Sequence, residues 1–227
     1  MRDLVWRNSM QFHFIYLAAG YSRRFGANKL LYPYDGTPMY RVLLGRLVSI
    51  LESDVLVKDI TVVTQYREIE DEVTRIGRET LKPVRCVINP DPSRGISSSI
   101  RCAVEYLAEE NEELAFCMDV TDPYEHAYAP DSTDHVLIFF VADTPHLTER
   151  TVTDFIHAFA LSGKRLGCIG RQGEMGNPGV FGSEFIPELM KLEGDRGGKR
   201  ILLAHRDKVF IFSDTNPEEL EDIDYSC

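Results

Sequence analysis

Apolar runs of strand length alternate with segments of helical spacing along most of this chain. The most apolar run, residues 135–142, predicts the central strand of a sheet. Between residues 40 and 51, apolar side chains recur every three or four positions, which is typical of an amphipathic helix. Strands that alternate with helices of this length predict βαβ units joined by right-handed crossovers. The pattern therefore predicts an α/β fold: a single Rossmann-like domain with a mainly parallel central sheet flanked by helices.

The other expected elements follow the same alternation. We predict further strands at residues 12–16, 59–64, 83–88, 165–170, 179–181 and 208–212, and further helices at residues 66–76, 97–111, 148–161, 184–191 and 199–204. Thr37 and Pro38 predict the start of the helix at residues 40–51, with Thr37 as its N-cap and Pro38 in its first turn.

The chain has 227 residues, of which 44% are hydrophobic, and this is enough to bury the core of one large domain. We predict a single domain over residues 1–227, in which residues 1–10 form a frayed N-terminal extension. Residues 109–134 carry nine acidic side chains and no sustained helical or strand period, which predicts an insertion loop. Two interpretations of this loop stay open: a solvated surface loop, or a lid or partner-docking loop.

Composition argues against several classes of partner and site. The formal net charge of −11 and the pI near 5.0 argue against a nucleic-acid surface. No apolar run approaches the roughly 18 residues of a membrane span. The five cysteines show no CxxC spacing and the six histidines show no HxH or HExxH arrangement, so we expect no metal site built from them. The odd cysteine count fits a reducing, cytoplasmic location.

A glycine-rich basic loop, residues 17–29 (LAAGYSRRFGANK), follows the first predicted strand. Gly20 and Gly26 permit a backbone whose successive N–H groups point at an anion. Arg23, Arg24 and Lys29 place three cations within seven residues of a chain that is acidic as a whole. At the carboxyl end of a strand, where α/β sheets bind ligands, this composition indicates a polyphosphate site. The loop has neither the Walker nor the Rossmann fingerprint, and a surface turn with solubilising charges is the alternative.

Asp143 stands directly after the predicted central strand, before Thr144 and Pro145. A carboxylate there would reach the same sheet edge as the basic loop. It would suit Mg²⁺, which binds one or two carboxylates together with substrate phosphate oxygens. The alternative is that Asp143 caps the helix that follows, or a turn at Thr144 and Pro145.

A third polar cluster lies at the start of the helix predicted at residues 97–111. Gly95 is followed by Ser97, Ser98 and Ser99, whose hydroxyls join the backbone N–H groups of a helix N-terminus. Small hydroxyl residues allow a flat nucleobase to lie against the backbone while its edge is read by hydrogen bonds. A helix cap is the alternative, although it explains one serine better than three.

The basic loop matches the string L-A-A-G-x-S-x-R-x-G-x-x-K, the signature of the MobA-like nucleotidyltransferases. The residues in register are Leu17, Ala18, Ala19, Gly20, Ser22, Arg24, Gly26 and Lys29. Within that superfamily the chain most resembles the molybdenum cofactor cytidylyltransferases, and later segments recur in the same order over nearly the whole chain. The resemblance implies a fold of the nucleotide-diphospho-sugar transferase type, with these loop residues binding the nucleotide.

Two further family motifs concern the nucleotide and its metal. Asp143 falls on the D-x-P motif, which implies a Mg²⁺ ligand. Gly95, Ser97 and Ser99 match the G-x-S-x-S loop that contacts the nucleobase, with Ser98 between them. The resemblance thus assigns the serine cluster to nucleotide binding.

Two motifs imply the acceptor side of the site. Gly176 and Asn177 match the family's G-[HN]-P element, and Asp195 and Gly197 match its G-D-x-G loop. A glycine-rich loop that opens a helix suits the phosphate of an acceptor. A simple turn between two helices is the alternative for Asp195.

Asp224 matches the second aspartate of the family's D-I-D-T-P-E-D element, which implies another metal ligand. The chain departs from the family here, because Tyr225-Ser226-Cys227 stand where T-P-E-D is expected. The departure leaves the assignment of Asp224 open.

The resemblance implies Mg²⁺-dependent transfer of a nucleoside monophosphate, CMP from CTP, to the phosphate of molybdopterin cofactor, with release of pyrophosphate. Lys29, Arg24 and Asp143 would be the catalytic residues: the two cations stabilise the departing pyrophosphate, and the carboxylate holds the metal. CTP and a phosphate-bearing acceptor would be the small-molecule partners, and a molybdoenzyme or its chaperone would receive the product.

Three alternatives to this function stay open. A guanylyltransferase usually has glycine where this chain has Ala19, and the added methyl group narrows the base pocket toward a pyrimidine. A sugar- or polyol-phosphate nucleotidylyltransferase would share the basic loop and the carboxylate. A non-catalytic nucleotide- or cofactor-binding module would keep the fold without turnover, but the presence of both Lys29 and Asp143 argues against it.

Overall fold

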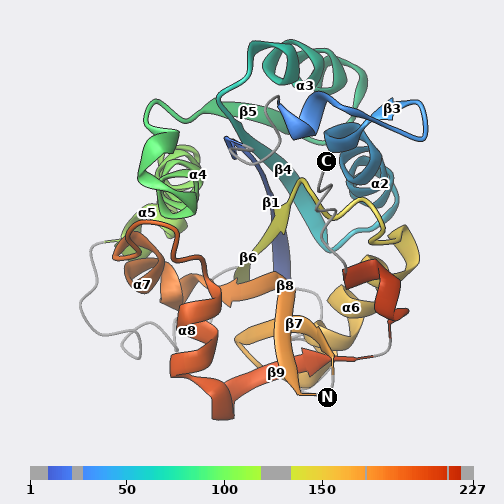
Figure 1. Ribbon diagram of the computed structural model, residues 1–227. Helices are drawn as coiled ribbons and strands as arrows, with labels where there is room; N and C mark the ends of the chain where they lie inside the picture. The colour runs from blue at the N-terminus through green and yellow to red at the C-terminus, as the bar shows by residue number, and fades with distance from the viewer. Residues whose placement is uncertain (1–9, 22–27, 119–133, 172, 214, 221–227) are drawn as a thin grey trace.

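The computed structural model describes residues 10–21, 28–118, 134–171, 173–213 and 215–220, and within these ranges seven strands form one sheet (Figure 1). Across the sheet the strands follow the order β5-β4-β1-β6-β8-β7-β9. Their bounds are Met10–Ala18 (β1), Val57–Thr64 (β4), Val84–Ile88 (β5), Asp134–Val141 (β6), Leu166–Arg171 (β7), Glu174–Gly182 (β8) and Val209–Phe212 (β9). Since β6 is the fourth of the seven strands, the prediction of a central strand at residues 135–142 is confirmed.

The sheet is mainly parallel, as predicted. β1 pairs in parallel with β4 on one side and with β6 on the other, and β4 pairs in parallel with β5. β8 is the exception, because it runs antiparallel to both β6 and β7, whereas β7 and β9 are parallel. One edge of the sheet therefore gathers the carboxyl ends of β1, β4, β5 and β6 together with the beginning of β8. We call this the ligand edge.

Helices cover both faces of the sheet (Figure 1). Helices α2, α3 and α6 pack in one buried cluster with Phe12 and Phe14 of β1, and helices α4, α5, α7 and α8 pack in a second cluster with Ile15 and Leu17. Side chains of a strand alternate between its faces, so β1 contributes to both clusters. No helix in the described ranges is long and apolar enough to cross a membrane. The helix bounds are Met39–Ser53 (α2), Arg67–Glu79 (α3), Ile96–Glu110 (α4), Glu112–Met118 (α5), Glu149–Ser162 (α6), Ile186–Met190 (α7) and Lys199–Ala204 (α8).

The segment before α2 differs from the prediction. Thr37–Pro38 forms a short strand, β3, which pairs with Pro33–Tyr34, β2. The two residues between these strands, Asp35 and Gly36, have positive φ values of 47° and 81°, as a tight hairpin turn requires. The turn draws Thr37 into strand pairing, and α2 shows no side-chain N-cap among the described residues. The prediction of Thr37 as an N-cap was therefore wrong.

The acidic segment at residues 109–134 is also more regular than predicted. Its first part completes α4 and forms α5. Asn111, between the two helices, accepts from the N–H groups of Glu113 and Leu114 at 2.9 and 3.2 Å and so caps α5. Leu114 and Cys117 are buried in the second cluster, which explains why this part is helical despite its charge. Residues 119–133 lie outside the described residues, as do residues 1–9, and Met10 belongs to β1 rather than to an extension.

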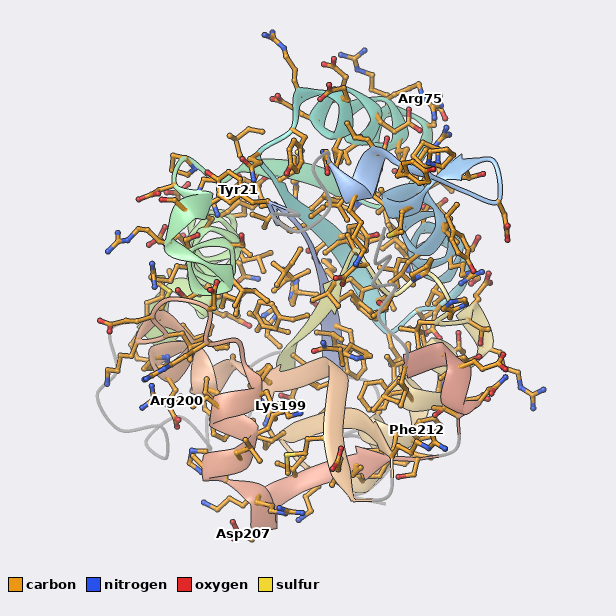
Figure 2. All side chains as sticks on the ribbon, viewed as in Figure 1. Tyr21, Arg75, Lys199, Arg200, Asp207 and Phe212 are labelled. Carbon is orange, nitrogen blue, oxygen red and sulfur yellow. The ribbon has the colours of Figure 1, made fainter. Side chains whose placement is uncertain are left out.

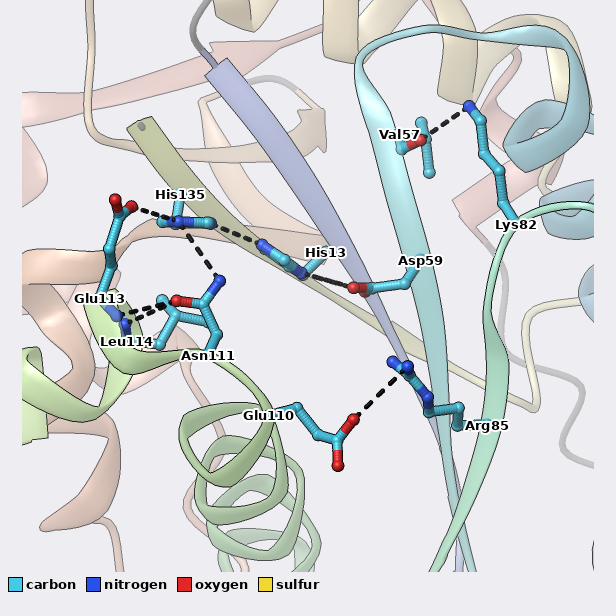
Figure 3. A network of polar contacts seen from close by, with 10 residues as sticks. All are labelled: His13, Val57, Asp59, Lys82, Arg85, Glu110, Asn111, Glu113, Leu114 and His135. Carbon is cyan, nitrogen blue, oxygen red and sulfur yellow. Dashed lines mark hydrogen bonds and ion pairs between the residues drawn. The ribbon is translucent and has the colours of Figure 1, made fainter. Parts of the chain in front are cut away.

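A row of buried polar side chains crosses three neighbouring strands (Figure 3). Nδ1 of His13 on β1 lies 3.0 Å from both carboxylate oxygens of Asp59 on β4, and its Nε2 lies 2.8 Å from Nδ1 of His135 on β6. Nε2 of His135 lies 2.8 Å from Oε2 of Glu113 on α5. Burial and the neighbouring His13 lower the pKa of His135 below its ordinary value. Since the basic loop follows the other end of β1, this row lies away from the ligand edge.

Candidate functional site

The first part of the basic loop leaves β1 at the ligand edge, where β4 and β6 also end. The N–H group of Ala142 donates to the carbonyl oxygen of Leu17 at 3.1 Å, which joins the segment that carries Asp143 to the start of the loop. The structure therefore brings two of the elements singled out in the sequence, the loop and the residue after β6, to one place.

Lys29 and Asp143 form an ion pair at this edge. Nζ of Lys29 lies 3.6 Å from Oδ2 of Asp143, and the side chains are 11% and 39% exposed. Asp143 is therefore a partly exposed carboxylate rather than a buried one. On β1, the buried hydroxyl of Tyr16 donates to the carbonyl oxygen of Tyr40 at 2.7 Å. Burial, followed by the charge of Asp143, raises the pKa of Tyr16, which keeps this hydroxyl protonated as a donor.

The structure excludes a helix-capping role for Asp143. The N-cap of α6 is Thr148, whose side-chain oxygen accepts from the N–H group of Thr151 at 3.2 Å. Asp143 lies before this cap and pairs with Lys29 instead. The metal-ligand interpretation of Asp143 and the alternative of a turn at Thr144 and Pro145 both stay predictions.

Arg46 of α2 fixes the segment that follows Asp143. Its Nη1 donates to the carbonyl oxygens of Pro145 and Leu147, at 2.5 and 2.8 Å. The contacts join residues about a hundred positions apart, so no local sequence signal points to them. Arg46 thus holds the backbone of the segment between Asp143 and α6.

Asn28 is a polar residue of this site that the sequence patterns do not single out. Its Oδ1 accepts from the N–H group of Leu30 at 3.1 Å and caps the short helix η2 (Lys29–Leu31). Its Nδ2 is buried and has no hydrogen-bond partner in the part of the chain that the structure describes. A buried donor without a partner is costly, so this atom next to Lys29 is suited to an acceptor atom of a ligand.

The serine cluster at the start of α4 is held by the protein itself. Nδ2 of the buried Asn89 donates to the hydroxyl oxygens of Ser98 and Ser99 at 2.8 and 2.9 Å, and the Ser98 hydroxyl donates to the carbonyl oxygen of Gly95 at 2.8 Å. Ser97 is fully buried. These hydroxyls therefore order the turn before α4, and their predicted contact with a nucleobase stays a prediction.

The same turn touches the predicted acceptor loop. The N–H group of Ser97 donates to the carbonyl oxygen of Gly194 at 3.2 Å. Gly95 has a φ of +82°, and a Cβ atom at this position would collide with the side chain of Asp195. A Cβ atom on Gly197 would lie 3.7 Å from the side chain of Ile96. The predicted nucleotide and acceptor elements are therefore direct neighbours.

Gly176 and Asn177 reach the ligand edge from the other direction. Because β8 runs antiparallel to β6, with Gly179 opposite Phe139, the first residues of β8 lie beside the carboxyl end of β6. Asn177 is exposed there and precedes a cis proline, Pro178. Figure 2 labels Tyr21, which follows β1, and Lys199, the first residue of α8.

Four residues assigned from the sequence lie outside the described residues: Ser22, Arg24, Gly26 and Asp224. Their roles stay predictions. Among the described residues, no group of three or more His, Cys, Asp or Glu side chains is arranged to hold a metal ion. Mg²⁺ binds one or two carboxylates and completes its shell with phosphate oxygens and water. Asp143 therefore fits a cation that arrives with a polyphosphate.

Comparison with known families and structures gives a consistent result. The model of the family described as MobA-like NTP transferase domain matches residues 14–209. A comparison with curated proteins found no significant match. The fold resembles Rv0371c from Mycobacterium tuberculosis H37Rv, with 20% identity, a TM-score of 0.58, and coverage of 90% of this chain and 88% of the other.

Two further structures share the fold at lower identity. One is 4-diphosphocytidyl-2C-methyl-D-erythritol synthase from Anaerococcus prevotii DSM 20548, with 12% identity, a TM-score of 0.62, and coverage of 96% of this chain and 92% of the other. The other is CMP:2-keto-3-deoxy-manno-octonic acid synthetase complexed with CTP, with 11% identity, a TM-score of 0.58, and coverage of 91% and 92%. At these identities the likeness shows a common fold.

Proposed function

The chain belongs to the MobA-like NTP transferase family, and from this premise we propose that it transfers CMP from CTP to the phosphate of molybdopterin cofactor and releases pyrophosphate. The observation that carries the proposal is the pair formed by Lys29 and Asp143 where β1 and β6 end side by side. A cation and a carboxylate in this arrangement suit a triphosphate and the divalent ion bound to it.

In the proposed reaction, an oxygen of the acceptor's phosphate attacks the α-phosphorus of CTP. A new P–O bond forms between the acceptor and the α-phosphorus. The bond between the α-phosphorus and the oxygen that bridges it to the β-phosphorus breaks, and pyrophosphate leaves with the bonding electrons. No general base is needed, because a phosphate monoester is already ionised near neutral pH. The protein's contribution is positioning and stabilisation of charge.

Three groups of the site would divide this work. The Lys29 ammonium group, with Arg24 as a further cation, would stabilise negative charge that builds on the departing pyrophosphate. The buried Nδ2 of Asn28 would donate to a nucleotide oxygen beside them. A Mg²⁺ ion held by Asp143 and the phosphates, with Asp224 as an expected second ligand, supplies further charge neutralisation when bound.

The acceptor would approach from the side formed by Gly176, Asn177, Asp195 and Gly197. Contact between Gly95 and Asp195 supports this placement, because it sets the predicted acceptor loop directly against the predicted nucleotide turn. The exposed Asn177 at the beginning of β8 reaches the same edge as Asp143. The preference for CTP rests on Ala19, whose methyl group narrows the base site relative to glycine.

A panel of nucleotides with the purified protein tests the proposal. Thermal stability is measured with Mg²⁺ and CTP, GTP, ATP or UTP, and CTP should give the largest increase. Ligand stabilisation grows with the logarithm of ligand concentration over Kd, so a tenfold preference amounts to about 1.4 kcal/mol at saturation. Release of pyrophosphate from CTP should then depend on addition of molybdopterin cofactor.

The alternatives give different results in the same panel. Greater stabilisation by GTP would overturn the cytidylyl assignment in favour of guanylyl transfer. Pyrophosphate release that requires a sugar or polyol phosphate, and is absent with molybdopterin cofactor, would assign another acceptor. Binding of CTP without turnover of any acceptor would identify a non-catalytic binding module.

A further inference from the structure

Three consecutive side chains, beginning with the last residue of β4, hold three consecutive carbonyl groups, beginning with the last residue of β1. We call them the 64–66 segment. The donors and acceptors are Thr64 Oγ1 to Ala18 O at 3.0 Å, Gln65 Nε2 to Ala19 O at 2.6 Å, and Tyr66 Oη to Gly20 O at 2.6 Å. Every one of these bonds joins residues 46 positions apart. The acceptor carbonyl groups belong to Ala18, Ala19 and Gly20, at the start of the basic loop.

These bonds continue the sheet beyond its last backbone pair. β1 and β4 are in parallel register up to Ala18, which lies opposite Thr64. At that point the β4 backbone bonds to the residue that follows β5 instead, since the carbonyl oxygen of Thr64 accepts from the N–H group of Asn89 at 2.8 Å. Side chains therefore replace backbone N–H groups as donors to the loop. The loop keeps the register of the sheet without being part of a strand.

The geometry of the peptide bond predicts where the N–H groups of residues 19–21 point. In a planar trans peptide, the C=O and the following N–H point to opposite sides. Carbonyls that point to the 64–66 segment therefore direct the N–H groups of residues 19–21 away from β4. Because β1 lies between β4 and β6, that direction is the side of β6, after which Asp143 stands. Successive N–H groups aimed at one place form an anion-binding concavity.

We propose that Gln65 and Tyr66 are positioning residues for the nucleotide, because they hold the loop so that its N–H groups face the phosphate oxygens beside Lys29 and Asp143. The inference rests on the proposed function and deepens it. A merely structural role is the rival: the Tyr66 N–H group donates to Thr64 Oγ1 at 3.1 Å, and the Tyr66 carbonyl accepts from the first turn of α3. Side-chain substitutions at 65 and 66 leave those backbone contacts in place.

The test uses the double variant Gln65→Met/Tyr66→Phe in the full chain, since both new side chains keep the size and lose the donor. The matched control is Lys82→Met, which removes two donated bonds, to the carbonyl oxygens of Asp54 and Val57, at the opposite end of β4. We expect the double variant to raise KM for Mg·CTP roughly tenfold, as loss of two modest hydrogen bonds implies, with kcat within about threefold. The control should leave KM unchanged at a comparable loss of thermal stability.

Hydrogen exchange without nucleotide gives an independent readout. Backbone amides at residues 19–21 should exchange faster in the double variant than in the wild type, and Lys82→Met should not change them. Unchanged KM in the double variant, an equal KM rise in the control, or unchanged exchange at residues 19–21 would overturn the inference. If the wild-type protein neither binds nor turns over any nucleoside triphosphate, the proposed function fails first; an active wild type with an unaffected double variant refutes this inference alone.

Discussion

Nζ of Lys29 and Oδ2 of Asp143 lie 3.6 Å apart, although one residue follows the first strand and the other follows the central strand. The lysine is largely buried and the carboxylate is partly exposed. An ion pair contributes little to stability when it is exposed, and the cost of desolvation offsets much of its attraction when it is buried, so this pair is a weak reason for the fold to keep both residues. In the proposed function, Lys29 binds the polyphosphate and Asp143 binds its divalent cation. The next two predictions test these roles separately.

Replacement of Lys29 should impair turnover far more than folding. Lys29→Met keeps an unbranched apolar stem and removes the charge, and it should lower kcat/KM for Mg·CTP by on the order of 100-fold, since one charged donor to a developing negative charge is worth that much. Steady-state kinetics of pyrophosphate release measure the loss. Lys82→Met serves as the control for a lost lysine. Turnover within a few-fold of wild type would make Lys29 a structural residue.

Replacement of Asp143 tests the proposed metal contact. Asp143→Asn keeps the shape and removes the charge, and we expect Mg²⁺-dependent turnover to fall by on the order of 100-fold or more. Because the carboxylate is 39% exposed and does not cap α6, the free energy of unfolding should change by no more than about 1 kcal/mol. Denaturant titration and kinetics are measured on the same preparation. An active variant, or an unfolded one, would contradict the ligand-binding role.

Gly95 should resist substitution because of its backbone and its neighbours. Its φ is +82°, and a Cβ atom would collide with Asp195 and the backbone of Gly194. Gly95→Ala should therefore cost about 1–3 kcal/mol of stability. Gly45→Ala, inside α2 where a Cβ atom meets nothing within 4 Å, should instead stabilise the protein by about 0.5–1 kcal/mol. Thermal unfolding of the two variants should shift in opposite directions; equal shifts would be inconsistent with this packing.

The buried histidine pair predicts how stability depends on pH. The pKa of His135 is lowered in the folded state by burial and by His13, so the unfolded chain binds the proton more readily. Stability that is present above the ordinary pKa of histidine should therefore be lost as pH falls through that value. His135→Gln keeps hydrogen-bonding capacity without titration and should show a smaller loss between about pH 7.5 and 5.5. Denaturant midpoints across this range measure the difference, and parallel curves would exclude His135 as a source.

The sequence predicted those parts of the fold that depend on local periodicity. The apolar run at residues 135–142 and the spacing at residues 40–51 identified β6 and α2, because continuous apolar runs and helical repeats are properties of neighbouring residues in the sequence. Thr37 misled because an N-cap and a hairpin strand favour the same residue type, and Asp35-Gly36 decided between them. Helix α5 was not predicted, because its acidic residues hid Leu114 and Cys117, which are buried in the second cluster.

The sequence predicted those site residues that belong to a local sequence motif. It did not predict those whose role depends on contacts between distant parts of the chain. Lys29 and Asp143 were found from their positions after strands. The sequence predicts only a helix that begins at Tyr66 and assigns no role to Gln65, because the carbonyl groups that these two side chains hold lie 46 residues earlier in the chain. Asn89, which occupies two of the serine hydroxyls expected to face a base, gave no signal either. Partners 46 residues apart, as for Gln65 and Tyr66, become visible only when the sheet order is known.

The row of Asp59, His13 and His135 also constrains how the central strands can assemble. Their side chains point to the same face of β4, β1 and β6 and pair only when these strands are adjacent and in the observed register. A slip of β1 by one residue would turn His13 to the opposite face and leave Asp59 buried without its partner. The surrounding apolar residues would tolerate such a slip far better, since one aliphatic contact resembles another. The polar row thus specifies the register of three central strands whose other contacts are mostly apolar.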